Sequence, residues 1–185
     1  GATAVTVTST SGGVVDGGDT DTDITANSGT VVIDAVTGVG STNAIDTQID
    51  TLDLDNTTSG NVDINETDAL DINQLDQDAA AGTVNVDAGG TITVVAAQSG
   101  VTGTAGQVEL DADGAASSIV VNDEVTTTGG AINILADDDA IFSADGDVTS
   151  AGGNVTVSGD ANAGGSGTDG ALTMADGAVI NAGSG

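Results

Sequence analysis

Apolar and polar residues alternate along most of this chain, in short runs separated by glycine and acidic residues. One phrase recurs in the segments that begin at Gly82, Gly106 and Gly130: a glycine, a small or polar residue, and then apolar, polar and apolar positions. This alternation has the period of two that is typical of a β-strand with one buried face. The pattern therefore predicts short strands.

The recurring phrase also has a regular spacing. The steps between these glycines are 106 − 82 = 24 and 130 − 106 = 24, and the step from Gly60 to Gly82 is 82 − 60 = 22. Such a period is typical of stacked repeats, in which neighbouring units bury an apolar face that no unit can bury alone. We expect the apolar positions of successive phrases to stack in one interior. These positions are Val84, Val86, Val108, Leu110, Ile132 and Ile134.

Two or three short strands in a unit of roughly 22–24 residues fit one coil of a parallel β-helix. We expect residues 1–185 to form a single all-β solenoid segment of seven units, two of them lengthened by loops at 36–43 and 159–170. The alternative is an antiparallel sandwich, which also shows short strands at intervals of about 8–12 residues. A sandwich does not require a constant phrase at a constant spacing, so the β-helix is favoured.

The composition raises a second alternative, disorder. The chain contains no Lys, Arg, His, Pro, Cys, Trp or Tyr, and its formal net charge is −29. High net charge with low hydrophobicity is typical of disordered chains. Here, however, 38% of the residues are hydrophobic, and they alternate regularly. This regularity favours a folded chain.

The missing residue types exclude several functions. Without cations or stacking aromatic residues, the chain offers nothing to a nucleic acid, and an anionic membrane surface would repel it. No apolar run approaches the length of about 18 residues that membrane insertion needs. Without His, a Ser-His-Asp arrangement is impossible, and the single Phe, Phe142, is expected in the core. We therefore expect no enzyme activity.

Calcium is the cofactor that the composition permits. Calcium prefers six to eight oxygen ligands from carboxylates and carbonyls, and two acidic clusters on glycine-containing turns supply such ligands. The candidate ligands are Asp16, Asp19, Asp21, Asp23, Asp137, Asp138, Asp139, Asp145 and Asp147. Their spacing matches neither an EF-hand nor a calcium-binding nonapeptide repeat. The alternative interpretation is a solvated acidic surface that keeps the protein soluble.

Stacking also brings like charges together. Asp63, Asn85, Glu109 and Asn133 occupy the same position in successive units. Two carboxylates about 4.8 Å apart would repel by roughly 0.9 kcal/mol even in water. We expect the amides in this series to dilute the repulsion and to hydrogen-bond to the neighbouring acids.

Several phrases resemble the repeats of large bacterial surface proteins. They are Gly-Asn-Val-Thr-Val-Ser-Gly from Gly153, the segment 130–148 and the segment 51–72. The family is that of the filamentous-haemagglutinin-like β-strand-repeat adhesins of two-partner secretion. The resemblance implies a right-handed β-helical shaft, used for adhesion or as an extracellular filament. The absence of basic residues departs from it and leaves a receptor-binding role unsupported.

These observations predict a structural segment of a secreted fibre or shaft at the bacterial cell surface. The alternative is an adhesin module that contacts a partner through the loops 36–43 and 159–170. An ice- or mineral-binding face would need regular rows of Thr or Asp, and these rows do not recur in every unit. Residues 1–8 and 178–185 read as ordinary strands, so we expect them to continue into neighbouring coils or to stack head to tail on other copies.

Overall fold

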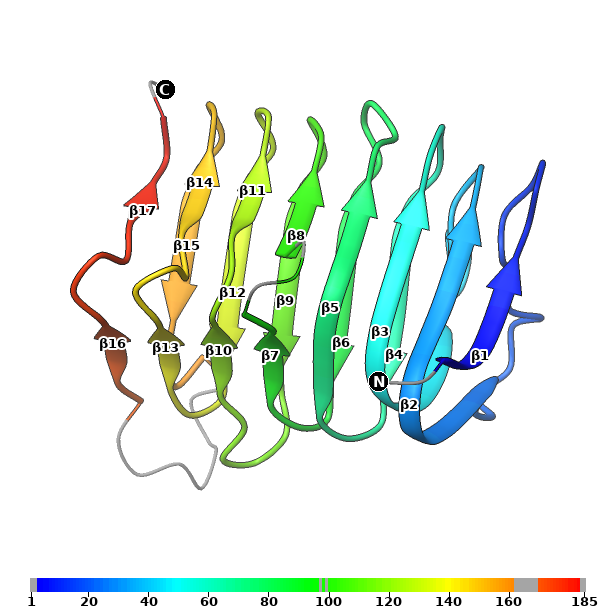
Figure 1. The fold of residues 1–185 in the computed structure, drawn as a ribbon, viewed down its shortest axis with the longest axis horizontal. Helices are drawn as coiled ribbons and strands as arrows, with labels where there is room; N and C mark the ends of the chain where they lie inside the picture. Colours follow the sequence, from blue (N-terminus) through cyan, green and yellow to red (C-terminus); the bar gives the residue numbers. More distant parts are fainter. Residues whose placement is uncertain (1–2, 97, 99, 162–169, 184–185) are drawn as a thin grey trace.

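The computed structural model describes residues 3–96, 98, 100–161 and 170–183. Within these residues it contains no helix, and therefore none that could cross a membrane. All strand pairs are parallel, and successive coils lie side by side along one axis (Figure 1). The chain is thus a parallel β-solenoid of about seven coils, which confirms the predicted fold class.

Three stacks of strands form the faces of the later coils. Face A consists of β4 (Val62–Glu66), β6 (Val84–Ala88), β9 (Val108–Ala112), β12 (Ile132–Ala136) and β15 (Val155–Ser158). Face B consists of β7 (Ile92–Val94), β10 (Ile119–Val121), β13 (Ala140–Phe142) and β16 (Leu172–Met174). Face C consists of β8 (Gly100–Gly103), β11 (Val125–Thr127), β14 (Val148–Ser150) and β17 (Ile180–Asn181).

The earlier coils use longer strands that continue from face B into face C. The first half of β5 (Leu70–Gln77) pairs with β7 and its second half with β8. β3 (Ile45–Asn56) pairs with β4 at its start and with β5 over the rest, and β2 (Ile24–Ala35) lies on β3. β1 (Thr3–Thr8) pairs with β2. In later coils a separate turn, such as 122–124 or 143–147, divides face B from face C.

Backbone hydrogen bonds between coils run along the solenoid axis. On face A the N–H groups of Val62, Val84, Val108 and Ile132 each donate to a carbonyl of the following coil, at 2.8 to 2.9 Å. Each strand also donates to the preceding coil, as the N–H of Asp63 does to the carbonyl oxygen of Val39 at 2.9 Å, so that donors and acceptors face both neighbours. The ladder therefore satisfies the backbone polar groups throughout the buried coils.

Two apolar columns run through the coils on faces B and C. The first consists of Val5, Val31, Leu52, Ile72, Val94, Val121, Phe142 and Met174. The second consists of Val7, Ile33, Leu54, Leu75, Val101, Val125, Val148 and Ile180. All members between the two ends are at most 1% exposed. Burying one such side chain contributes about 1.5–3 kcal/mol, so the columns are a major source of stability.

The predicted stack on face A is also confirmed. Val84 pairs with Val108 and then Ile132, and Val86 pairs with Leu110 and then Ile134. All six side chains are buried. Their order is the one that the spacing of the glycine phrase predicted.

The repeated glycine has a physical reason. Gly60, Gly82, Gly106, Gly130 and Gly153 stack at the corner that precedes face A. A Cβ atom built on Gly106 would lie 2.0 Å from the carbonyl oxygen of Gly82, and one on Gly130 would lie 1.7 Å from that of Gly106. Only a residue without a side chain permits backbones to approach so closely.

Residues 36–43 differ from the loop that was expected there. Val39 is fully buried and bridges Val14 and Val62, so this segment supplies a coil of face A with an interior residue. Its Gly and Ser content indicated a loop, but the glycines serve close approach, because a Cβ on Gly40 would lie 2.2 Å from the carbonyl oxygen of Asp63. The loop predicted at 159–170 lies mostly in residues 162–169, which are outside the described ranges.

The last residues of the two columns lie on one strand at the N-terminal end and on two strands at the C-terminal end. β1 holds Val5 and Val7 on one strand and pairs on one side only, with β2. At the other end, Met174 lies on β16 and Ile180 on β17, each of which has one described partner strand. Leu172 is 52% exposed and Met174 is 42% exposed, although both stand on buried residues of β13.

Candidate functional site

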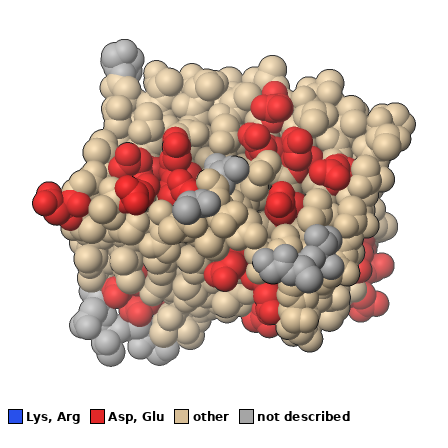
Figure 2. All heavy atoms as spheres, viewed as in Figure 1, with Lys and Arg blue, Asp and Glu red and all other residues tan. Residues whose placement is uncertain are grey.

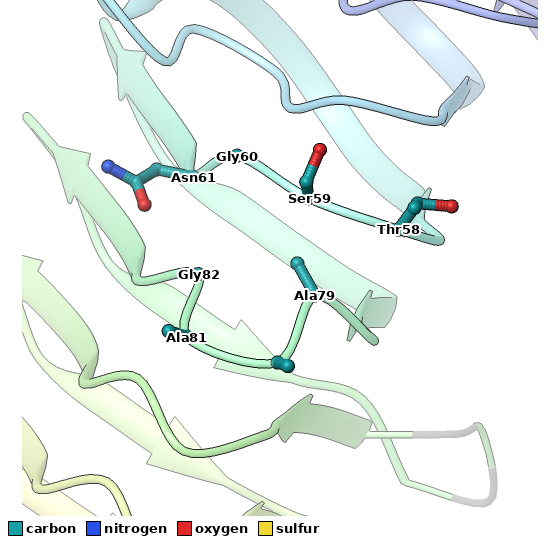
Figure 3. Close-up of a pocket in the computed structure, with 8 residues that line it drawn as sticks. Thr58, Ser59, Gly60, Asn61, Ala79, Ala81 and Gly82 are labelled. Carbon is teal, nitrogen blue, oxygen red and sulfur yellow. The ribbon is translucent and has the colours of Figure 1, made fainter.

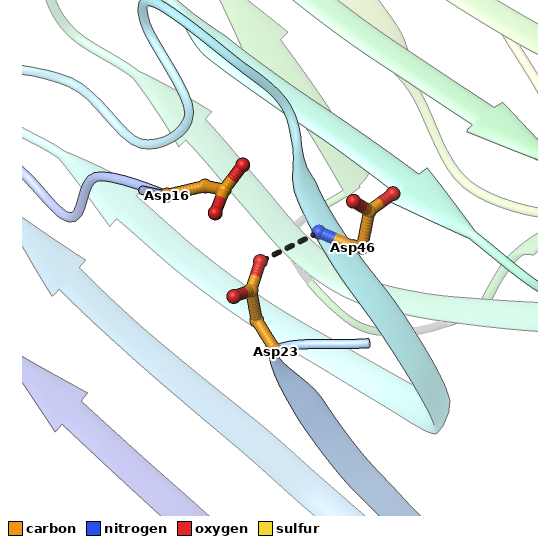
Figure 4. Close-up of side chains that lie close together, drawn as sticks. All are labelled: Asp16, Asp23 and Asp46. Carbon is orange, nitrogen blue, oxygen red and sulfur yellow. Dashed lines mark hydrogen bonds between the residues drawn. The ribbon is translucent and has the colours of Figure 1, made fainter. Parts of the chain in front are cut away.

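Three carboxylates converge near the N-terminal end. One oxygen from each of Asp16, Asp23 and Asp46 lies within 4.8 Å of the other two (Figure 4). Among the described residues, no other three acidic side chains form such a group. Asp16 and Asp23 belong to the first predicted calcium cluster.

The coil structure brings this group together. Asp23 directly precedes β2 and Asp46 lies on β3, which stacks on β2. The N–H of Asp23 donates to the carbonyl oxygen of Asp46 at 2.8 Å, and the N–H of Asp46 donates to Oδ2 of Asp23 at 3.1 Å. The sequence interpretation missed Asp46. The signal was present, because the step from Asp23 to Asp46 (46 − 23 = 23) equals the length of one coil.

Two asparagines already hydrogen-bond to this group. Asn43 donates its side-chain N–H to Oδ2 of Asp16, and Asn65 donates to Oδ1 of Asp46 at 2.6 Å. A calcium ion at this group would need further oxygen ligands beyond the three carboxylates to reach six to eight. The group can attract a cation, and each of its acids also accepts a hydrogen bond from the chain itself, Asp23 from the N–H of Asp46.

The other predicted ligands of the first cluster lie outside the group. Oδ1 of Asp19 accepts a hydrogen bond from the N–H of Asp21 at 3.0 Å, and both side chains are exposed. Asp19 thus closes its own turn, as aspartate commonly does.

The second predicted cluster does not converge as a group of three. Three of its acids instead accept hydrogen bonds from backbone N–H groups of neighbouring coils. Oδ2 of Asp137 accepts from Ala116 at 3.1 Å, Oδ1 of Asp139 from Ala171 at 2.7 Å, and Oδ1 of Asp147 from Val179 at 2.8 Å. Asp145 and Asp138 take part through their backbone carbonyls, which accept from Asp147 and Asp160. These contacts fit a structural role in the turns.

A buried carboxylate that the sequence interpretation missed lies between faces A and B. Glu66 accepts hydrogen bonds from Oγ1 of Thr47 at 2.7 Å and from the N–H of Ile49 at 3.1 Å. Burial raises the pKa of Glu66, while hydrogen bonds from Thr47, Asp68 and Ile49 oppose this rise. The signal was present, because residue 66 continues the period of two from Val62 and Ile64 and occupies the position of Ala88 in the next coil.

Asn56 and Gln77 form a second buried polar group in stacked coils. Nδ2 of Asn56 donates to Oε1 of Gln77 at 2.8 Å, and Oδ1 of Asn56 accepts from the N–H of Gly38 at 2.9 Å. Nε2 of Gln77 donates to the carbonyl oxygens of Gly60 and Thr83, both at 3.2 Å. These bonds satisfy the backbone at the glycine corner, so their role is structural.

A depression of about 280 Å³ lies beside the same corner (Figure 3). It is lined by Thr58, Ser59, Gly60, Asn61, Ala79, Ala80, Ala81 and Gly82. These residues offer hydroxyl, amide and methyl groups but no ionisable or aromatic side chain. The depression therefore contains no general acid or base that could activate the hydroxyl groups of Thr58 and Ser59.

The visible charge is of one sign only. Acidic side chains form separate groups on an otherwise uncharged surface, and no cation lies among them (Figure 2). Comparisons of the chain with protein-family models, with curated proteins and with solved structures find no match. The fold and these acidic groups are thus the basis for a functional proposal.

Proposed function

We propose that this chain is a structural segment of a secreted, acidic bacterial surface fibre, in which further solenoid coils stack on its ends. One observation carries the proposal. The apolar columns pass through the interior and reach both ends, and at the C-terminal end Leu172 and Met174 on β16 are exposed. An exposed apolar patch of this kind is typical of an interaction surface.

The terminal strands support the same role. β1, β15, β16 and β17 contain no charged residue and no Pro. Isolated sheets usually protect their edges with charges, Pro or a covering segment, because open edges pair with other strands. Unprotected edges suit a segment whose ends pair with neighbouring coils. The phrases that resemble filamentous-haemagglutinin-like adhesins support the bacterial surface as its location.

The two ends present the columns on different numbers of strands. Val5 and Val7 lie on one strand at the N-terminal end, whereas Met174 and Ile180 lie on two strands separated by the turn 175–179. The chain already joins these two arrangements within its own coils, because the first half of β5 pairs with β7 and its second half pairs with β8. Further coils of the same protein and a copy stacked head to tail are therefore both candidate neighbours at the C-terminal end.

Electron microscopy of the native material tests this function. We expect a thin, unbranched filament in which antibodies against this segment label the shaft. Labelling of compact particles without filaments would contradict the proposal. The adhesin alternative, through residues 36–43 and 159–170, stays a prediction, and in the first of these segments Thr37, Ser41 and Thr42 are the exposed side chains.

A further inference from the structure

On face A, acidic and amide side chains alternate from coil to coil. Asp63, Asn85, Glu109 and Asn133 are stacked in register. Nδ2 of Asn85 donates to Oδ1 of Asp63 at 3.0 Å, and Nδ2 of Asn133 donates to Oε2 of Glu109 at 2.7 Å. Each amide supplies a hydrogen bond to one acid, and Asn85 separates two acids. This is the arrangement that the sequence predicted for stacked like charges.

Two runs break this alternation. Among the paired positions of the described strands, one carboxylate follows directly on another in only three steps: Asp34 to Asp55, Asp55 to Asp76, and Asp87 to Asp111. The first run lies at the face-C end of β2, β3 and β5, and the second lies on β6 and β9. No amide separates the acids in either run.

The same two runs contain unpartnered buried oxygens. Across the described part of the chain, two buried side-chain oxygen or nitrogen atoms lack a hydrogen-bond partner, and they are Oδ1 of Asp55 and Oδ1 of Asp111. A buried polar atom without a partner is costly, and more so in a charged group. Both atoms thus occur where an amide donor is missing from the ladder.

We propose that these two acid runs are a pH-responsive device, in which a proton shared between stacked carboxyl groups takes the place of the missing amide N–H. The protonated acid donates an O–H to the ionised acid of the adjacent coil, so that one negative charge is removed and a short O–H···O⁻ bond forms. The folded solenoid therefore becomes more stable as the pH falls. This inference does not depend on the proposed fibre function.

A proton suits these runs better than a divalent cation. Neither run brings three carboxylates together as the Asp16 group does. The groups that face the two runs are all acidic or uncharged, so no side chain of the protein neutralises them. Asp111 faces Asp87 on β6 and Leu135 on β12, with Glu109 and Asp113 beside it. The corresponding neighbours of Asp55 are Asp34, Asp53, Asp76 and Asp78.

The direction of the titration agrees with this geometry. Burial, followed by the charges of Asp87, Asp113 and Glu109, raises the pKa of Asp111 to about 6. Burial and neighbouring acids also raise the pKa of Asp87, Asp55 and Asp76. A raised pKa means that the folded chain binds protons more tightly than the unfolded chain. The stabilisation is complete below the unfolded pKa near 3.8 and is lost as the pH rises through about 6.

The first experiment measures urea unfolding of the whole chain between pH 7.5 and pH 5, with chelator present throughout. Because the pKa of Asp111 moves from 3.8 to about 6, this group alone should raise the folding equilibrium constant about tenfold over that range. Asp111→Asn restores an amide to the ladder. We expect the variant to be more stable than the wild type at pH 7.5 and to lose this part of the pH dependence.

Asp71→Asn is the matched control, because Asp71 is stacked between Thr51 and Thr93 and has no acidic neighbour in register. It should retain the pH dependence. A second measurement needs no variant to fold: the carboxyl carbon of Asp111, followed by NMR in the ¹³C-labelled wild type, should titrate near pH 6. Titration near pH 4, or an Asp111→Asn variant with the wild-type pH dependence, would overturn the proposal.

Discussion

At the scale of single residues, the glycine corner shows how little space separates the coils. The glycines that revealed the repeat in the sequence are those whose missing side chains let one backbone lie directly on the next. They are therefore needed for steric reasons at most of these positions. Gly60 is an exception in part, because it also has a positive φ of 82°.

This leads to a direct test. Gly106→Ala would place a methyl group 2.0 Å from the carbonyl oxygen of Gly82, so we expect a loss of about 2 kcal/mol or more in the free energy of unfolding. Gly129→Ala is the control, because a Cβ there has no heavy atom within 4 Å. Its effect should be neutral or a gain of up to about 1 kcal/mol, through the unfolded state. Equal urea midpoints for the two variants would contradict this account of the corner.

At the scale of the strand, the interior stack is the element that stabilises the fold. Ile134 is fully buried between Leu110 and Val157 on neighbouring coils. Its neighbours on both sides are apolar, so a charge placed there would find no partner.

Ile134→Asp should therefore unfold the chain or cost about 4 kcal/mol or more, because it buries an unpaired charge. The control is Thr156→Asp, which adds the same charge at an exposed position of β15. Circular dichroism during urea unfolding measures both variants. A fold that tolerates Asp at residue 134 as well as at residue 156 would contradict the interior register.

The strand scale also explains what could be predicted from the sequence. The period of two and the regular spacing of the glycine phrase predicted the strands, the parallel stack and the buried members of face A. Val39 was missed because it lies among Gly and Ser. Glu66 was missed because a carboxylate is not expected inside, although the period of two from Val62 and Ile64 reaches it, and its partner Thr47 belongs to another coil. Asp46 could have been found by applying the coil period to Asp23.

At the scale of the whole molecule, the uncompensated charge of −29 predicts a response to cations. The three carboxylates of Asp16, Asp23 and Asp46 are where we expect calcium to act. At ten times its dissociation constant, a ligand that binds only the folded state adds about 1.4 kcal/mol. We expect calcium to raise the melting temperature above that in magnesium or chelator at equal ionic strength.

Asp46→Asn should abolish the specific calcium effect, whereas Asp71→Asn should keep it. The Asp137–Asp147 group offers a further comparison, since Asp145→Asn should leave the effect intact. Identical melting temperatures in calcium, magnesium and chelator would contradict a specific calcium site. The acidic groups would then be a solvated surface that responds only to general salt screening.

The open C-terminal end predicts that an added coil will stabilise the protein. A second copy of residues 106–129, which contain β9, β10 and β11, would be joined after residue 185. We expect it to cover Leu172 and Met174 and to raise the melting temperature. The same residues in scrambled order are the control. If the ordered and scrambled extensions melt alike, and a non-specific protease removes both, the end does not accept a coil.

The hydrogen bonds between coils lie along the axis, and this has a mechanical consequence. A pull on the two chain ends would peel coils one at a time from an end, because each terminal coil is held only by its single neighbour. One coil adds about 4.8 Å to the folded length. The same coil, such as the segment from Gly82 to Gly106, spans about 80 Å when extended. Each coil that unfolds therefore lengthens the chain many times over. A shaft of such coils would extend stepwise under a sudden load before it broke.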